Sequence, residues 1–359
     1  RGAPAVAGGR RVRATLDRWF SLEANGTTPR TEVVAGLTTY LALAYIVFVQ
    51  PAVLSAAGMD FGAVMVATCL ASAFATLLMA WWANYPIAVA PAMGHNFYFA
   101  FAVVVGMQVP WPVALGAVAI AGLVFVLTAG IGLRERVIAA MPPFLQRATA
   151  AGIGLLIATI GLQWAGVIVA TPGTMVGLGD LRHPVTVLAL AGLAVTAVLA
   201  ARGTSAAILI GMAVTTALGL VTGIVQYGGL VSAPPSIAPT FLQLDIAGAL
   251  TPALAPIILI FFLLALFDSI GTLVGVASRA GLMRDGQLPR ARQALMADAV
   301  GTVAGAALGT STVTAYIESS TGVAAGGRTG LANVVTAALF LLSLFLFPLV
   351  RMIGGGYPV

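Results

Sequence analysis

Apolar runs long enough to cross a bilayer, separated by short polar segments, fill almost the whole chain. About 20 apolar residues in a helix span the hydrocarbon core, so the pattern predicts an all-α polytopic membrane protein. Barrel strands are not expected, because the runs lack their alternation of polar and apolar residues. The predicted spans are residues 33–56, 62–83, 86–106, 112–133, 148–170, 185–201, 204–226, 252–278, 294–309, 311–325 and 331–348. A twelfth run begins just before Val359.

The composition excludes a soluble protein. Hydrophobic residues make up 60% of the 359 residues and charged residues only 8%, against about 25% charged in a soluble domain. The net charge of +6 follows from the topology described next and does not indicate a nucleic-acid-binding patch. We therefore expect the protein to lie in a lipid bilayer, and we do not expect it to bind nucleic acid.

The arginines fix the predicted orientation. All 17 basic residues are arginine, and 15 of them follow an even number of predicted crossings, so they lie on one side. Cytoplasmic loops carry the excess of basic residues, which makes that side, and the N-terminus, cytoplasmic in a bacterial inner membrane. Only Arg182 and Arg351 fall on the opposite side. The 15 are Arg1, Arg10, Arg11, Arg13, Arg18, Arg30, Arg134, Arg136, Arg147, Arg202, Arg279, Arg284, Arg290, Arg292 and Arg328.

The third and tenth spans are interrupted. Pro86 and Pro91 prevent a regular helix in the first half of the third, and β-branched, hydroxylic residues 310–314 favour an extended start to the tenth. We therefore expect a short strand followed by a half-helix in each. Paired interruptions in corresponding spans indicate a transporter substrate site at their meeting point. Ordinary kinks in membrane helices are the alternative.

These positions correspond if the chain consists of two inverted repeats of seven spans. We expect a cytoplasmic tail over residues 1–32, a first repeat over 33–226 and a second repeat over 252–359. The second repeat has little more than half the length of the first. Roughly 80–100 residues, enough for two or three spans, are therefore expected to be missing at the C-terminus.

Two carboxylates lie inside predicted spans. Asp268 lies within the eighth and Glu318 within the tenth, with no basic residue in either span. An acid at this depth is costly and marks a substrate or ion pathway by default. Each is expected either to be protonated or to accept N–H groups of a ligand; a structural role bonded to neighbouring hydroxyls is the alternative. Asp298, near the start of the ninth span, is interpreted as an N-terminal or interfacial acid.

Three neighbours in the third span are candidates beside these acids. Asn96 offers hydrogen-bond donors and an acceptor, the ring of Phe97 could stack on a flat heterocycle, and His95 could relay protons. Each could instead be an ordinary buried residue. His183 is expected in an external loop. The sequence has no metal-ligand cluster, no cofactor motif and no nucleophile elbow, so neither a metal, a cofactor nor enzymatic activity is predicted.

Four stretches carry a family resemblance, namely residues 22–39, 90–94, 267–272 and 309–330. They resemble the nucleobase–cation symporter-2 (nucleobase/ascorbate transporter) family in its AzgA-like hypoxanthine/adenine/guanine permease branch. The resemblance covers essentially the whole chain from about Phe20. It implies a fourteen-span, seven-plus-seven fold with a core domain (spans 1–4 and 8–11) and a gate domain (spans 5–7 and 12 onward), proton coupling and a possible homodimer.

The resemblance also implies site residues. Glu318 and Asp268 match the substrate-binding acids, Asn96 a third-span polar contact, and Phe97 a stacking ring. The backbone near Phe97, Ile317 and Ser319 is expected to contact the base.

Four positions depart from the branch and leave the exact base open. His95 stands where an apolar residue is usual, Ala92 where glycine is usual, Phe97 where a small residue is common, and Gln50 where asparagine is usual.

The sequence thus predicts proton-coupled uptake of a purine nucleobase by alternating access. Glu318, Asp268 and His95 are the candidates to carry the proton. A uracil, xanthine or other heterocycle symporter of the same fold is the nearest alternative. An anion transporter of related fold is less compatible with two unpaired carboxylates.

Overall fold

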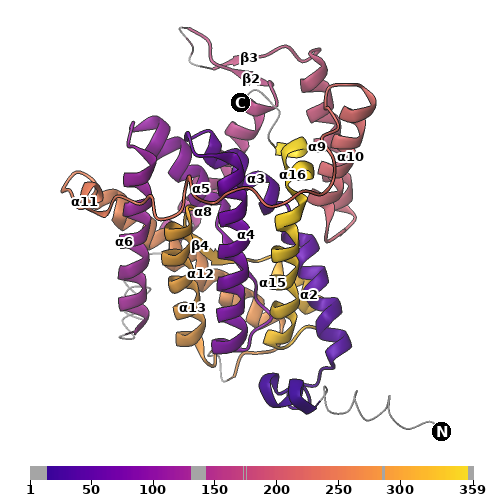
Figure 1. Ribbon diagram of the computed structural model, residues 1–359, viewed down its shortest axis with the longest axis vertical. Coiled ribbons are helices and arrows are strands. Elements are labelled where there is room, and N and C mark those ends of the chain that lie inside the picture. Colours follow the sequence, from indigo (N-terminus) through magenta and orange to yellow (C-terminus); the bar gives the residue numbers. More distant parts are fainter. Residues whose placement is uncertain (1–13, 131–142, 173, 175, 285–287, 355–359) are drawn as a thin grey trace.

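The structure is a computed structural model that describes residues 14–130, 143–172, 174, 176–284 and 288–354 (Figure 1). Most of these residues are helical, and two pairs of very short strands interrupt the helices. The helices are α2 (Pro29–Leu43), α3 (Ile46–Ser55), α4 (Phe61–Leu78), α5 (Met93–Phe97), α6 (Trp111–Gly130), α8 (Pro143–Trp164), α9 (Pro184–Ala201), α10 (Ala207–Val221), α11 (Ile246–Ala249), α12 (Ala255–Arg279), α13 (Ala291–Leu308), α14 (Ser319–Ala324), α15 (Gly330–Ser343) and α16 (Phe347–Gly354). The π-helices η1 (Met79–Ala83) and η2 (Tyr98–Gly106) extend α4 and α5, and the 3₁₀ turn η3 (Leu344–Leu346) joins α15 to α16. The strands are β1 (Val89–Pro91), β2 (Ile168–Val169), β3 (Gly177–Leu178) and β4 (Val313–Ala315).

Among the described residues, six helical stretches are long and apolar enough to cross a membrane. They coincide with the predicted first, second, fourth, sixth, eighth and eleventh spans. Shorter apolar helices at Met93–Gly106, Ala151–Trp164 and Ala207–Val221 occupy the third, fifth and seventh. The ninth is α13 and the tenth is β4 followed by α14. The polytopic helical class is therefore confirmed, while the predicted twelfth run falls on residues 355–359, outside the described part of the chain.

The short strands predicted in the third and tenth spans are present, and they pair with each other. β1 and β4 are antiparallel, with Val89 opposite Ala315 and Pro91 opposite Val313. Backbone bonds continue on both sides, from Tyr316 N–H to Ala88 C=O and from Ala92 N–H to Thr312 C=O, both 2.9 Å. Each strand leads into a half-helix, α5 or α14, so the two interrupted segments cross in the interior.

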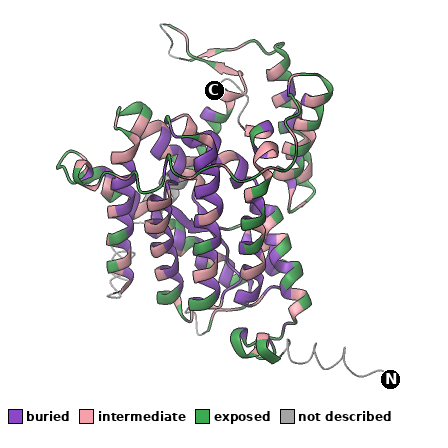
Figure 2. Cartoon of the chain, in the orientation of Figure 1, coloured by how far each residue is buried: buried purple, intermediate pink, exposed green. Residues whose placement is uncertain are grey.

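Helices pack closely around this crossing. α13 lies against α4 and α6, and α15 lies against α2 and α4. Glycine permits the closest approaches: a methyl group added at Gly301 of α13 would lie 2.7 Å from Ala75 Cβ, and one at Gly122 of α6 would lie 2.9 Å from Val303 Cγ2. Figure 2 shows the result, a buried centre around α4. Within an 18-residue apolar window of Phe61–Ala83, 78% of the residues are buried, against 17% of the residues of α9, which packs with α10 at one edge of the molecule (Figure 1).

Buried side chains complete the hydrogen bonding of the strand segment. Asn333 of α15 donates its side-chain N–H groups to Tyr85 C=O (2.9 Å) and Ile87 C=O (2.7 Å). The Thr76 hydroxyl accepts from Val89 N–H (3.0 Å) and donates to Val89 C=O (2.9 Å). A buried peptide group without a partner is costly, so these side chains make the extended conformation tolerable in an apolar interior.

We expect the substitution Asn333→Ala to destabilise the protein, because it leaves two buried carbonyl groups without their donors. Each such loss costs about 1–3 kcal/mol. Thermal unfolding in detergent should show a clearly lower melting temperature than the parent. Asn25→Ala is the control, since the Asn25 side chain donates only at the exposed surface, to Ser21 C=O. Equal melting temperatures for the two variants would contradict the role assigned to Asn333.

Candidate functional site

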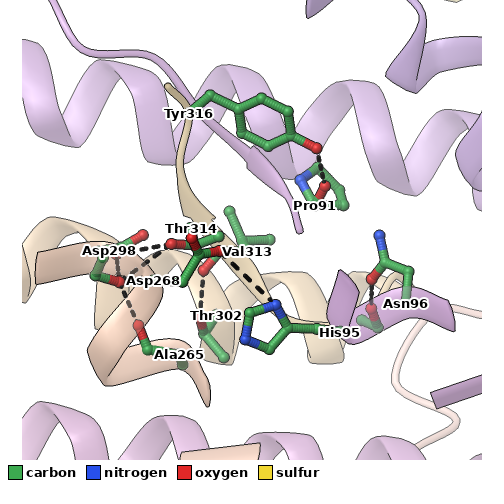
Figure 3. Close-up of polar contacts among 12 residues, drawn as sticks. Pro91, His95, Asn96, Ala265, Asp268, Asp298, Thr302, Val313, Thr314 and Tyr316 are labelled. Atoms are coloured by element: carbon green, nitrogen blue, oxygen red, sulfur yellow. Dashed lines mark hydrogen bonds and ion pairs between the residues drawn. The ribbon is translucent and has the colours of Figure 1, made fainter. Parts of the chain in front are cut away.

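The candidate site lies where the β1–β4 crossing meets α12. Ala92 precedes the first turn of α5, and Glu318 precedes the first turn of α14. Figure 3 shows polar side chains from α5, α12, α13 and β4 gathered at this point. α12 contacts β4, α5 and α14. Three elements far apart in sequence thus converge, as expected if the interrupted segments form a site.

Glu318 lies at the end of the β4 segment and is partly buried. Its Oε1 accepts a hydrogen bond of 2.8 Å from the Tyr45 hydroxyl, across 273 residues of sequence. Tyr45 lies at the junction of α2 and α3. The nearby Tyr316 hydroxyl is directed elsewhere, to Pro91 C=O at 2.5 Å. One lone pair of the carboxylate is therefore used internally, and the remaining acceptor capacity is left for a ligand.

Asp268 lies in the middle of α12 with its side chain 46% exposed. His95 Nδ1 is 3.9 Å from Asp268 Oδ2, too far for a hydrogen bond (Figure 3). The face of α12 that carries Asp268 is turned toward the tenth span, because a methyl group added two turns later at Gly275 would lie 3.7 Å from Ile317 Cδ1. α12, which carries Asp268, also contacts α14, which Glu318 directly precedes.

His95 is buried, with 3% of its side chain exposed. Neither ring nitrogen has a hydrogen-bond partner among the described residues. Buried polar atoms are nearly always paired, so an unpaired imidazole beside an open carboxylate indicates a position where a ligand or proton supplies the missing partner. The structure thus brings together Glu318, Asp268 and His95.

Asn96 is fully buried in a chain of polar side chains that joins three elements. Its side-chain N–H donates to Gln50 Oε1, and its Oδ1 accepts from the Ser311 hydroxyl. Gln50 Nε2 donates in turn to Thr310 Oγ1 at 2.9 Å. The network ties α3, α5 and the start of the β4 segment together. Gln50, noted in the sequence only as a departure from the resembled branch, is thus part of the site's support.

The other predicted residues occupy three different environments. Phe97 is 4% exposed, with its ring centroid 5.7 Å from that of Phe101 and 6.3 Å from that of Trp164. Ile317 is 52% exposed. Ser319 is fully buried and its hydroxyl accepts from Ala88 N–H at 2.9 Å. Ser319 therefore joins the start of α14 to the β1 segment.

The interpretation of Asp298 as an N-terminal or interfacial acid is wrong. Its side chain is completely buried, and Oδ2 accepts from the hydroxyls of Ser269 and, at 3.4 Å, Thr314 (Figure 3). The error came from the boundary: α13 begins at Ala291, three residues before the predicted span, so Asp298 lies two turns inside. Its spacing from the buried Leu295 and Thr302 is the helical signal that could have placed it.

The described residues contain no group of three or more His, Cys, Asp or Glu side chains placed to hold a metal ion. The chemistry of the site is that of hydrogen-bond acceptors facing a partly open region. Tyr45 could not have been found from spacing, because it reaches Glu318 only through the tertiary fold.

The family model and similar relatives point to the same protein family. Residues 30–355 match the Permease family. The putative permease MJ0326 of Methanocaldococcus jannaschii is 53% identical over 94% of this chain and 78% of its own length. The adenine permease AdeP of Escherichia coli is 48% identical over 95% of this chain and 77% of its own. The guanine/hypoxanthine permease PbuG of Bacillus subtilis is 44% identical over 94% of this chain and 80% of its own.

Solved structures share the fold at low sequence identity. The transmembrane domain of the cyanobacterial bicarbonate transporter BicA aligns with a TM-score of 0.65 at 16% identity, over 91% of this chain and 85% of that one. SLC26A9 aligns with a TM-score of 0.62 at 12% identity, over 97% and 60%.

These structural neighbours establish the fold, and the sequence relatives establish the family. With a match over residues 30–355 and permeases at 44–53% identity, the chain belongs to the nucleobase–cation symporter-2 family of membrane permeases.

Proposed function

We propose that this permease takes up purine nucleobases with protons across the plasma membrane, its N-terminus in the cytoplasm, and that Glu318 and Asp268 bind the base. The observation that carries the proposal is the convergence of two carboxylates, from α14 and α12, on one region with no arginine placed to neutralise them among the described contacts. The permeases named for adenine and for guanine and hypoxanthine support the same substrate class.

A purine base suits this arrangement chemically. Its ring and exocyclic N–H groups are donors, and hydrogen bonds to a carboxylate are roughly twice as strong as neutral ones. A methyl group added at Gly271, one turn from Asp268, would meet nothing within 4 Å, so a flat ring has room on this side of α12. We assign Phe97 and the backbone near Ile317 to the surroundings of the base.

Asn96 and Ser319 are proposed to act at the same site by holding its two half-helices. Asn96 links α5 to Ser311, and Ser319 links α14 to Ala88. Each bond therefore ties one interrupted segment to the other. A base held between the half-helices would depend on both links for its geometry.

The site is less suited to an anionic substrate than to a purine base. The structural neighbour named as a bicarbonate transporter is only 16% identical to this chain. At that identity the likeness supports a common fold and says nothing about a common substrate. An anion placed between Asp268 and Glu318 would be repelled by both carboxylates, because all three groups carry negative charge.

The domain organisation belongs to the same proposal. Inverted repeats over 33–226 and 252–359 would relate β1 to β4 by a two-fold axis, and the antiparallel pairing of these strands supports that relation. Spans 1–4 and 8–11 would form a core domain, and spans 5–7 would belong to a gate domain. Movement of one domain against the other would expose the site to alternate sides.

We expect Glu318→Gln and Asp268→Asn to abolish proton-driven uptake of labelled hypoxanthine. Losing one charged hydrogen bond costs about 1.5–3 kcal/mol, which is about tenfold to hundredfold in affinity. Uptake into cells that lack other purine permeases measures the effect. Asp245→Asn, at the exposed N-cap of α11, is the matched control and should transport normally. Normal uptake by both site variants would show that the site lies elsewhere.

The substrate class is tested by competition against labelled hypoxanthine. We expect unlabelled adenine, guanine and hypoxanthine to compete, because each offers N–H donors to the two carboxylates. Uracil, xanthine, ascorbate and bicarbonate should compete weakly. Strong competition by uracil or xanthine, without competition by adenine or guanine, would replace the adenine, guanine and hypoxanthine proposal by that of a uracil or xanthine symporter of the same fold.

His95 is proposed to take part in proton coupling, since both ring nitrogens are unpaired and one lies 3.9 Å from Asp268. The variant His95→Leu should lose accumulation driven by a pH gradient and retain exchange of labelled for unlabelled base in proteoliposomes. His183→Leu, at the exposed N-cap of α9, is the control. Accumulation by His95→Leu with the parent's pH dependence would leave the carboxylates as the sole proton carriers.

A further inference from the structure

A second site is indicated by a cavity of about 590 Å³ that shares no residue with the region around Glu318 and Asp268. It lies where the N-terminal segment, the α4–β1 linker, the α12–α13 loop and the α14–α15 turn meet. Figure 1 shows the N-terminal segment and the α12–α13 loop at the same end of the molecule. This is the end predicted to face the cytoplasm.

Three arginines line the cavity, Arg284, Arg290 and Arg328, and none of the described residues that line it is acidic. Two of the guanidinium groups are held by neutral partners. Arg328 Nη1 donates to Val323 C=O (2.9 Å) and Gly327 C=O (2.7 Å), and the Arg290 guanidinium carbon lies 5.4 Å from the centroid of the Tyr85 ring. These contacts orient the cations without neutralising them. A guanidinium has five N–H donors, so several remain for a ligand.

The backbone around the cavity adopts uncommon conformations. Arg290 and Asn84 have φ values of 54° and 52°, in the left-handed region that few non-glycine residues occupy. Asn84 is held there by a bond from its side chain to Phe20 C=O (2.8 Å) and one from Gly330 N–H (2.7 Å). Tyr85 also lines the cavity, with its ring beside the Arg290 guanidinium. Strain of this kind persists where the surroundings enforce it, which is frequent at binding sites.

The excess of arginines on the cytoplasmic side explains which end of the protein carries them. It does not explain why arginines of two segments, the α12–α13 loop and the α14–α15 turn, converge on one cavity whose described lining residues include no carboxylate. Like charges brought together in this way repel each other, and a bound anion would remove that cost. Arginine binds phosphate oxygens in a bidentate manner.

We propose that this cavity binds a phosphate group, either of a soluble phosphate compound or of an anionic lipid headgroup. The phosphate would connect the α12–α13 loop through Arg284 and Arg290 to the α14–α15 turn through Arg328. Since α12 carries Asp268 and Glu318 directly precedes α14, occupancy would stabilise the arrangement of the two carboxylate-bearing elements from the cytoplasmic end.

The test uses the complete protein in phosphatidylcholine nanodiscs, with melting temperature as the readout. In one arm inorganic phosphate is titrated against potassium chloride of matched ionic strength. In the other arm phosphatidylglycerol replaces part of the phosphatidylcholine. A ligand that binds the folded protein raises its melting temperature, so we expect a rise in at least one arm. Arg284→Gln and Arg290→Gln should weaken the apparent affinity about tenfold or more, while Arg202→Gln, an exposed arginine outside the cavity, should behave as the parent.

The two arms distinguish the sources of the phosphate. A response to inorganic phosphate alone identifies a soluble ligand, a response to phosphatidylglycerol alone identifies the lipid headgroup, and both responses identify a site that accepts either. The proposal is overturned if neither probe raises the melting temperature above the chloride control. It is equally overturned if Arg284→Gln and Arg290→Gln respond as Arg202→Gln does. Because the readout is not transport, failure here leaves the proposed substrate site untouched.

Discussion

The structure depends on the antiparallel crossing of two extended backbone segments in an apolar interior. Extended backbone at membrane depth is tolerated only where protein or water satisfies its polar groups. Here β1 and β4 satisfy each other, and side chains of Thr76, Ser319 and Asn333 complete the bonding at the edges. Because the strands end at this crossing, the half-helices α5 and α14 must begin there. A site for polar ligands between their first turns is thus a direct consequence of how the backbone is hydrogen-bonded.

The buried and partly buried acidic side chains of this protein differ in how their carboxylate oxygens are hydrogen-bonded. Asp298 is buried and bonded to hydroxyls of α12 and β4, which makes it part of the packing. Glu318 and Asp268 keep acceptor capacity directed at open space, which makes them available to a ligand. Glu32 shows a third arrangement, fully buried yet satisfied by the N–H groups of Arg328 (2.8 Å) and Thr329 (3.3 Å) at the start of α15. Burial alone therefore does not identify a functional carboxylate in this protein, and neither does an unpaired oxygen, because Asp298 Oδ1 also has no hydrogen-bond partner among the described residues. Asp268 and Glu318 differ from Asp298 and Glu32 in being exposed or only partly buried.

The sequence was informative where a physical constraint acts locally. Prolines in the third span and β-branched residues in the tenth predicted strands that the structure contains, and long apolar runs predicted the helices. Contacts between residues far apart in the sequence could not be predicted from local patterns. The spacing of residues therefore did not indicate the Tyr45–Glu318 hydrogen bond or the Gln50–Asn96–Ser311 chain. The position of Asp298 was missed because a three-residue error in a helix start moved it from the interior to the surface. Family resemblance contributed the substrate class, which composition and periodicity do not contain.

One consequence concerns which parts of the protein can move independently. Neighbouring residues of α12 face opposite ways: Asp268 toward the open region, Ser269 toward Asp298 of α13, with Thr314 of β4 completing the buried cluster. A rotation of α12 that displaced Asp268 would have to break this cluster and leave a carboxylate unpaired in an apolar interior. Asp268 is thus locked in register with the strand that leads to Glu318. A displacement of Asp268 relative to the strand that leads to Glu318 would therefore cost the hydrogen bonds among Ser269, Asp298 and Thr314.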